Sequence, residues 1–254
     1  MKAVTTHLPM SIGDYTDFFA GINHAFNVGT MFRGSVNALQ PNYKHLPVGY
    51  HGRSSSVVIS GAGIRRPRGQ ILPNIEVKIP TFQPSQRLDI ELELGAFLCK
   101  GSKMGDNIPI ASAKEAVFGY VLLNDWSARD ILTWEYVPLG PFNAKNFGTT
   151  IGTTISPWVV LADALEPFKC AGNENDTELL SYLQEQEKDT MYDISLEVDL
   201  ISKSKISNLL LTRTPINIII ARSGASTTVS RTNSRNLLWS FPQMLAHLAL
   251  LVVQ

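Results

Sequence analysis

The chain has 254 residues, with 22 Lys plus Arg against 22 Asp plus Glu, so its formal net charge is zero. This balance gives no electrostatic reason to expect nucleic acid or an anionic membrane as a partner. The length suffices for one large domain or two small ones with a sizeable core.

Cysteine usage and the two termini bear on the compartment. Two cysteines, Cys99 and Cys170, lie far apart in the chain, which fits a reducing compartment, and we expect a cytoplasmic protein. The first residues contain no apolar stretch of the signal-peptide kind. The apolar ending HLALLVVQ is too short to span a bilayer.

Residues 1–75 are rich in Gly, His, Asn, Pro and Arg and show few long periodic segments. The run SSSVVISG at 54–61 predicts a short strand that ends at Gly61. We expect ordered loops and turns elsewhere in this region, and loops of this composition often carry binding and catalytic residues.

Residues 86–168 are the most strand-like part of the chain. The alternation in RLDIELELGAF at 87–97 predicts one strand. ASAKEAVFGY at 111–120 predicts a short helix with Ser112 as N-cap. The apolar VLLN then predicts a strand that runs into a polar turn, and TTISPWVVLADAL at 153–165 predicts another strand.

Residues 169–254 differ from the preceding region in composition and periodicity. A polar stretch at 171–190 predicts a loop, and YDISLEVDLI at 192–201 alternates like a strand. Residues 221–236 are rich in Ser, Thr and Arg and are typical of a loop or disordered segment. Residues 236–252 have apolar residues at roughly helical spacing and predict a helix kinked or delayed by Pro242.

The alternating strand would place Asp89, Glu91 and Glu93 in a row on one face. One interpretation is a solvated or edge-strand face kept soluble by charge. The other is a site for a hard cation such as Ca²⁺ or Mg²⁺, which would relieve the repulsion between the carboxylates. The second interpretation needs further oxygens, for which Asp17 and Asp125 are candidates.

Several long motifs resemble the fumarylacetoacetases, within the fumarylacetoacetate hydrolase family. They are GDYTDFF, NHAFNVGTMFR, NALQPNYKHLPVGYHGRSSSVVISG, LDIELELGAF, LLNDWSARDI, WEYVPLGPF and KNFGTT. The resemblance is nearly continuous over 12–168 and weaker around 192–200 and 233–248. It implies a mostly β fold with minor α (α+β), a mixed β-roll, as one catalytic domain over 1–254.

The resemblance also implies a function. The family hydrolyses the C–C bond of fumarylacetoacetate to fumarate and acetoacetate in tyrosine and phenylalanine catabolism, with Ca²⁺ and Mg²⁺, as a homodimer. Two alternatives stay open. One is a catalytically inactive, metal-binding truncated isoform, and the other is a related acylpyruvate hydrolase or decarboxylase.

Residue roles follow from the same resemblance. The metal ligands implied are Asp17, Glu91, Glu93 and Asp125, with Lys145 and Thr149 near a second metal position. The catalytic residues implied are His24 as the base for water, with Lys145 and Arg129 stabilising oxyanion and enolate charge. The substrate-binding positions implied are Phe19, Arg33, Tyr50, Leu132 and Tyr136. Because GTTIGTTI is a tandem repeat, Thr153 competes with Thr149.

Structural interpretations remain beside these roles. His24 also suits a satisfied structural histidine, and Tyr50 and Tyr136 suit packing aromatics. Arg129 also suits an ion pair with Asp125 or Asp130. Asp89 matches no ligand of the family and keeps the interpretation of a solvated residue.

The chain departs from the family in four ways. Phe19 stands where the family has Tyr, and Leu132 stands where it has Gln, so two hydrogen-bonding groups are lost. The family's N-terminal β domain and its last strands, with the acid that orients the histidine, are expected to be absent. Residues 201–232 diverge, and we interpret the chain as a truncated or aberrantly spliced product.

Overall fold

The computed structural model describes residues 5–74, 76–152, 159–171, 177–195, 200–201, 206–207, 215–219 and 248–253. The loop expected at 221–236 lies outside these described residues, as does the first part of the strand expected at 153–165.

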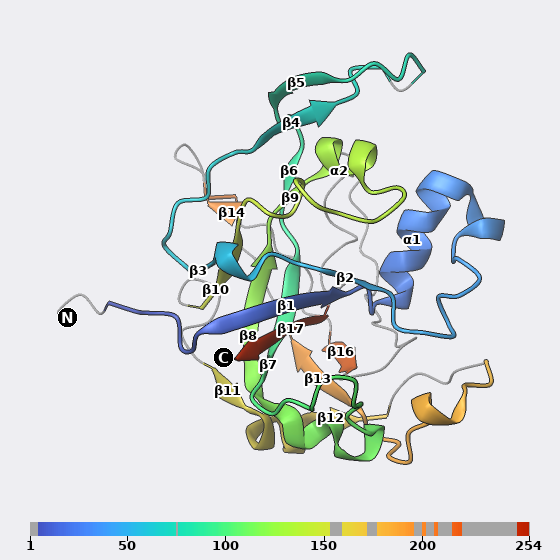
Figure 1. The fold of residues 1–254 in the computed structure, drawn as a ribbon, viewed down its shortest axis with the longest axis vertical. Coiled ribbons are helices and arrows are strands. Elements are labelled where there is room, and N and C mark those ends of the chain that lie inside the picture. Colours follow the sequence, from blue (N-terminus) through green and yellow to red (C-terminus); the bar gives the residue numbers. More distant parts are fainter. Residues whose placement is uncertain are drawn as a thin grey trace.

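A central mixed sheet organises the fold (Figure 1). Its strands are β1 (Ile12–Phe18), β2 (Gly49–His51), β3 (Val57–Ile59), β7 (Leu92–Leu98), β8 (Val117–Asp125), β10 (Thr149–Ile151), β11 (Val160–Leu161) and β17 (Leu248–Val253). The order is β2-β1-β17-β7-β8-β10-β3, and β11 pairs with β8. Two of these pairs are parallel, β17 with β7 and β10 with β3, while the others are antiparallel.

Smaller elements surround this sheet. The small sheets are β4 (Arg68–Ile71) with β5 (Thr81–Pro84), β6 (Leu88–Asp89) with β9 (Ser127–Ala128), β14 (Leu200–Ile201) with β15 (Ile206–Ser207), and β12 (Lys169–Cys170) with β13 (Met191–Ser195) and β16 (Pro215–Ile219). The helices are α1 (Ile22–Arg33) and α2 (Arg129–Glu135), with 3₁₀ turns at Ser35–Asn37, Ser54–Ser56, Ile110–Ala116, Ala162–Phe168 and Ser181–Leu183. The predicted mostly β fold with minor α is confirmed.

Both faces of the central sheet are covered. One face carries the cluster Tyr15, Val57, Phe97, Val121, Leu123, Ile151 and Leu251. The other face carries the cluster Leu94, Ala96, Tyr120 and Tyr192. Neighbouring residues of a strand point to opposite faces, so Ala96 and Phe97 of β7 belong to different clusters. Apart from Glu93, β7 is therefore apolar on both faces, as is typical of a strand buried on both sides.

The N-terminal region is more regular than its composition predicts. The inward-facing residues of β1 are Tyr15 and Asp17, and both are buried. Because Asp17 is a carboxylate, β1 lacks the alternation of apolar and polar residues by which a strand is predicted. The buried residues of α1 are His24, Ala25 and Gly29, which give little apolar period. The prediction of loops over β1 and α1 is therefore wrong. The short strand expected at 54–61 is confirmed only at Val57–Ile59, as β3, because Ser54–Ser56 form a 3₁₀ turn.

Two predictions in the middle of the chain are also corrected. The single strand expected at 87–97 is interrupted between β6 and β7, so Glu91 lies outside both strands. The helix expected at 111–120 is a 3₁₀ turn that ends at Ala116, and Val117 begins β8. The Ser112 hydroxyl donates to the Pro109 carbonyl at 3.3 Å and does not act as an N-cap.

The helix predicted at 236–252 is corrected at its C-terminal end. Residues 236–247 lie outside the described residues, and 248–253 form β17, which lies between β1 and β7. A short, wholly apolar run suits a buried strand as well as a helix, because periodicity cannot separate the two. The sheet is thus continuous from β1 through β17 to β7.

Two further observations concern the described residues. None of their helices is both long and apolar enough to cross a bilayer. Cys99 and Cys170 do not form a disulfide.

Candidate active site

Three carboxylates from three strands converge in the interior. Asp17 lies on β1, Glu93 on β7 and Asp125 at the end of β8, and each has an oxygen within 4.8 Å of the others. All three side chains are 0% exposed. The structure therefore brings together three of the four carboxylates that the resemblance implied as metal ligands, and we call them the acidic trio.

The electrostatics of the acidic trio favour a cation. Burial, together with Asp17 and Asp125, raises the pKa of Glu93 well above its usual range. Burial also raises the pKa of Asp125 to about 6, although Lys145 acts in the opposite direction. Ca²⁺ and Mg²⁺ prefer such hard oxygen ligands, and a bound ion would offset the repulsion between the carboxylates. The donor set therefore fits either ion.

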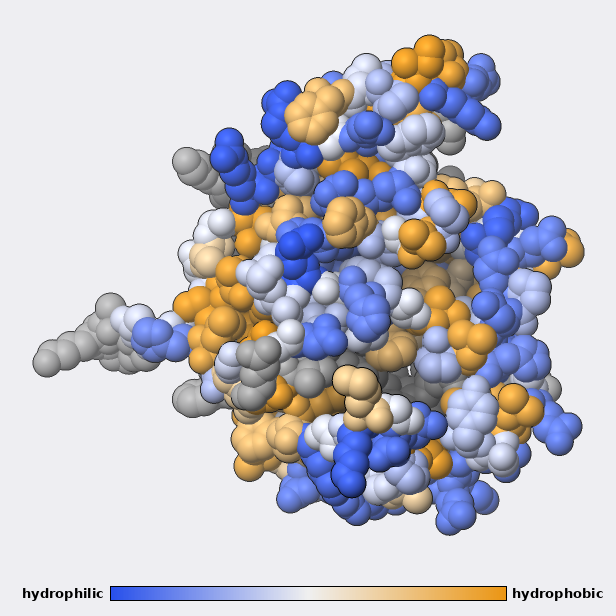
Figure 2. Space-filling model, in the orientation of Figure 1, coloured by the Kyte–Doolittle hydropathy of each residue, from blue (hydrophilic) through white to orange (hydrophobic). Residues whose placement is uncertain are grey.

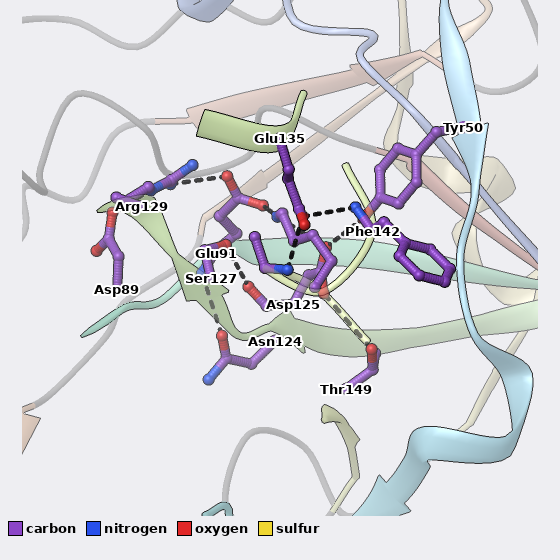
Figure 3. A network of polar contacts seen from close by, with 12 residues as sticks. Tyr50, Asp89, Glu91, Asn124, Asp125, Ser127, Arg129, Glu135, Phe142 and Thr149 are labelled. Atoms are coloured by element: carbon purple, nitrogen blue, oxygen red, sulfur yellow. Dashed lines mark hydrogen bonds and ion pairs between the residues drawn. The ribbon is translucent and has the colours of Figure 1, made fainter. Parts of the chain in front are cut away.

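Glu91 is held by two cations at the side of the acidic trio (Figure 3). Arg129 Nη2 lies 2.7 Å from Glu91 Oε1, and Lys145 Nζ forms an ion pair with Oε2. The Glu91 backbone is fixed as well, because its carbonyl accepts the Asp125 N–H at 3.0 Å. Its side chain is buried beside the trio, and its predicted role as a direct metal ligand stays a prediction.

Lys145 joins Glu91 to the acidic trio. Its Nζ donates to Asp125 Oδ2 at 2.8 Å, and the side chain is almost fully buried. Burial by itself lowers the pKa of Lys145, but Asp125 and Glu91 outweigh it, so the pKa lies above its usual range. A protonated ammonium group has no lone pair for a metal. The geometry thus favours Lys145 as a counter-ion, and its role as a ligand stays a prediction.

Asp89 is not the solvated residue that was expected. It is 8% exposed, and its Oδ2 lies 2.9 Å from Arg129 Nε. The pairing of β6 with β9 explains this position, because Asp89 lies opposite Ser127 and close to the start of α2. Arg129 therefore bridges Asp89 and Glu91. The sequence had suggested Asp125 or Asp130 as its ion-pair partner.

Tyr50 and Thr149 both contact Asp125. The Tyr50 hydroxyl donates to Oδ2 at 2.8 Å, and the Thr149 hydroxyl lies 3.5 Å from Oδ1. Sheet register explains both contacts, since Thr149 is paired with Asp125 across β10 and β8, and Tyr50 is paired with Asp17 across β2 and β1. Thr153, its competitor in the repeat, lies outside the described residues.

His24 is buried on the inner side of α1, with 6% of its surface exposed. The ring of Phe19 meets it edge-on, with centroids 5.0 Å apart. Tyr43 supports Phe19 from behind, because its hydroxyl donates to the Phe19 carbonyl at 2.9 Å. Gly29 of the same helix has no room for a Cβ, which would lie 1.7 Å from the Ala38 carbonyl oxygen. Close packing therefore fixes the helix that presents His24.

Three predicted substrate positions lie outside this polar network. Arg33 donates to the carbonyls of Asn37 and Ala38, at 3.0 and 2.6 Å. Leu132 packs on the apolar cluster around Ile131, and Tyr136 is 39% exposed. Their substrate contacts stay predictions.

Sequence reasoning missed Glu135, the last residue of α2. Its carboxylate accepts the backbone N–H groups of Phe142, Asn143 and Ala144. The only sequence signal is an acid followed by the Pro- and Gly-containing run YVPLGP, which is too common to identify such a contact.

Comparisons with known proteins find similar sequences over almost the whole chain. The family described as fumarylacetoacetate (FAA) hydrolase C-terminal matches residues 15–252. Fumarylacetoacetase fahA of Aspergillus fumigatus is 59% identical over 251 residues, which cover 97% of this chain and 53% of that protein. Fumarylacetoacetase of Homo sapiens is 46% identical over 245 residues, which cover 96% of this chain and 53% of that protein. The chain thus spans about half the length of these curated relatives.

Solved structures are more distant. A fumarylacetoacetate hydrolase from Exiguobacterium antarcticum is 23% identical with a TM-score of 0.39, and the match covers 66% of this chain and 50% of that one. A likeness this weak supports no argument.

Proposed function

The chain belongs to the fumarylacetoacetate hydrolase family, and we propose that it hydrolyses the C–C bond of fumarylacetoacetate to fumarate and acetoacetate in tyrosine and phenylalanine catabolism. One observation carries the proposal. The buried oxygens of Asp17, Glu93 and Asp125 converge within 4.8 Å, and cationic and hydroxyl donors surround them.

The acidic trio would hold Ca²⁺ or Mg²⁺. When bound, the ion supplies a Lewis acid that polarises a carbonyl of the β-diketone. Strand backbones fix the three carboxylates before any ligand arrives, because Asp17, Glu93 and Asp125 all belong to one continuous sheet. Pre-organisation of this kind lowers the cost of positioning during the reaction.

His24 would take the proton of the attacking water. An imidazole suits this role, since it can accept a proton from water at physiological pH. Burial on α1 and the edge-on ring of Phe19 restrict the orientation of the imidazole. Water then adds to the carbonyl, the C–C bond breaks, and the bonding electrons remain on the acetoacetate fragment until it is protonated.

Lys145 and Arg129 would stabilise the negative charge that develops on the oxyanion and on the leaving enolate. Both are cationic, and their pKa values lie above the usual range. Asp125 and Glu91 outweigh the effect of burial on Lys145, and Glu91 and Asp89 outweigh it on Arg129. Fixed positive charges in a dry site stabilise such charge more than in water. Tyr50, whose hydroxyl already donates to Asp125, adds a neutral donor.

A related acylpyruvate hydrolase or decarboxylase is the second candidate. It is favoured by Phe19 and Leu132, which offer no hydrogen-bonding group where the family has Tyr and Gln. Phe19 packs on His24 and Leu132 on an apolar cluster, so neither position can donate to a substrate.

We further propose a cytoplasmic homodimer, which the family resemblance implies. The projecting hairpin of β4 and β5 supports the dimer, because Ile79 and Phe82 on this hairpin are each 67% exposed. Figure 2 shows hydrophobic residues at the end of this projection. Apolar side chains gathered on a projecting element are typical of a surface that contacts another protein.

The test is steady-state turnover of fumarylacetoacetate by the purified chain with Ca²⁺ or Mg²⁺, followed by loss of diketone absorbance. We expect turnover that Asp125→Asn abolishes and that the exposed control Asp106→Asn leaves unchanged. Acylpyruvates and oxaloacetate are assayed in parallel, and turnover of one of these in place of fumarylacetoacetate would support the second candidate. A folded chain that binds metal but cleaves none of these substrates would contradict both and support an inactive metal-binding protein.

A further inference from the structure

The segment that carries Lys145 is anchored by Glu135. Glu135 Oε1 accepts the N–H groups of Phe142 at 2.8 Å and Ala144 at 2.7 Å, while Oε2 accepts that of Asn143 at 3.0 Å (Figure 3). Three consecutive amides thus point at one carboxylate, directly before Lys145 in the chain.

These amides begin a tight turn. The Phe142 carbonyl accepts the N–H groups of Lys145 at 3.1 Å and of Asn146 at 2.9 Å, as in the first turn of a helix. A carboxylate at the start of such a turn satisfies amides that have no other partner in the turn, and bonds to an ionised acceptor are the stronger kind. The turn is also fixed on its other side, because the carbonyl oxygen of the buried Ala144 accepts the Ala128 N–H at 2.9 Å.

The turn carries one donor to Asp125, and the loop before the turn lies close to a second. Lys145 extends from it to Asp125 Oδ2 at 2.8 Å and to Glu91. Gly140, in the same loop, lies against Tyr50, since a Cβ at Gly140 would be 3.9 Å from the Tyr50 Cβ. Tyr50 donates to the same Asp125 oxygen at 2.8 Å.

We propose that Glu135 is a positioning residue for the reaction. Within the described part of the chain its carboxylate hydrogen-bonds to three backbone amides of the loop. It acts by fixing the turn at 142–146 so that the Lys145 ammonium stays between Glu91 and Asp125. The part of this inference that concerns turnover rests on the proposed function, whereas the coupling between Glu135 and Lys145 does not.

The kinetic test compares Glu135→Ala and Glu135→Gln with the wild type in the full chain. Glu135→Ala removes all three acceptors, and we expect kcat to fall about 10- to 100-fold with KM changed less than about threefold, since a displaced charge acts in the transition state. Glu135→Gln keeps one oxygen for Phe142 and Ala144 but presents an NH₂ to Asn143, so an intermediate kcat is expected. The matched control is Glu115→Ala, whose residue is exposed and paired with Lys100.

A cycle with Lys145→Met shows whether Glu135 acts through Lys145. If it does, Glu135→Ala lowers kcat little further in the Lys145→Met background, and the two shifts in melting temperature are not additive. Unchanged kcat in Glu135→Ala, or an equal loss in Glu115→Ala, would overturn the inference. If the wild type shows no turnover, the proposed function fails, and the melting cycle still decides: non-additive shifts support positioning, and additive shifts overturn it.

Discussion

Lys145 Nζ lies 2.8 Å from Asp125 Oδ2, and both side chains are almost completely buried. A buried ion pair contributes little net stability when both partners are present, but loss of one partner leaves an uncompensated charge. This relationship connects the stability of the fold to the chemistry of the acidic trio, and several predictions depend on it.

Lys145→Met should destabilise the chain by about 3–5 kcal/mol at neutral pH, because Asp125 and Glu91 keep their burial but lose the ammonium group. Urea unfolding followed by circular dichroism measures this difference. The control Lys100→Met removes an exposed lysine paired with Glu115 and should cause no measurable change. Equal effects of the two substitutions would show that the Lys145 pair is accessible to water.

Cation binding should strengthen as pH rises through about 6, since burial raises the pKa of Asp125 to about 6 from 3.8. The folded state then holds more protons than the unfolded state between these values, so without metal this group's contribution to stability falls as pH rises through that window. A cation competes with the proton. Thermal melts with Ca²⁺ or Mg²⁺ should therefore show a larger metal-induced increase in Tm at pH 7.5 than at pH 5.

The same comparison in Asp125→Asn provides the control. With no titrating carboxyl at this position, the metal-induced increase in Tm should be small at both pH values. An increase in the wild type that does not change between pH 5 and 7.5 would contradict competition between the proton and the metal.

Tyr50→Phe should lower kcat about 10-fold and destabilise the chain by about 1 kcal/mol, because it removes a single hydrogen bond to Asp125. Tyr182→Phe, at a residue that is 64% exposed, is the matched control and should have no effect. Steady-state kinetics and urea unfolding measure both quantities. If Tyr50→Phe has the kinetics of the wild type, the Tyr50 hydroxyl has no role in turnover and the residue serves only in packing.

Leu251→Ala should cost about 2–5 kcal/mol, because Leu251 of β17 is 0% exposed within the main apolar cluster. The control Leu139→Ala concerns a side chain that is 94% exposed and should be neutral. Unfolding free energies measure both. A neutral Leu251→Ala would mean that the C-terminal strand does not complete the sheet between β1 and β7.

The sequence could predict the site better than the elements that carry it. Its motifs pointed to four carboxylates, and three of them, Asp17, Glu93 and Asp125, converge. The same polar residues concealed the secondary structure, since β1 buries Asp17 where a strand pattern needs an apolar residue. The buried residues His24 and Gly29 likewise weakened the apolar period of α1.

Other differences arose from tertiary contacts that no local pattern encodes. Asp89 alternates with apolar residues as a solvated side chain would, but pairing of β6 with β9 buries it against Arg129. The apolar run at 248–253 suits a helix or a strand, and its place between β1 and β7 decides for the strand. The contact of Glu135 with the turn before Lys145 depends on the path of the intervening loop.

Direct titration of cations into the metal-free chain tests the central claim, that the acidic trio holds a divalent ion. After treatment with EDTA and its removal, calorimetry with Ca²⁺ or Mg²⁺ at pH 7.5 should show saturable binding to the wild type. Glu93→Gln should weaken this binding at least about 10-fold, because it replaces a charged ligand with a neutral one. Wild-type chain that is folded but binds neither ion, or Glu93→Gln that binds as tightly as the wild type, would contradict the account.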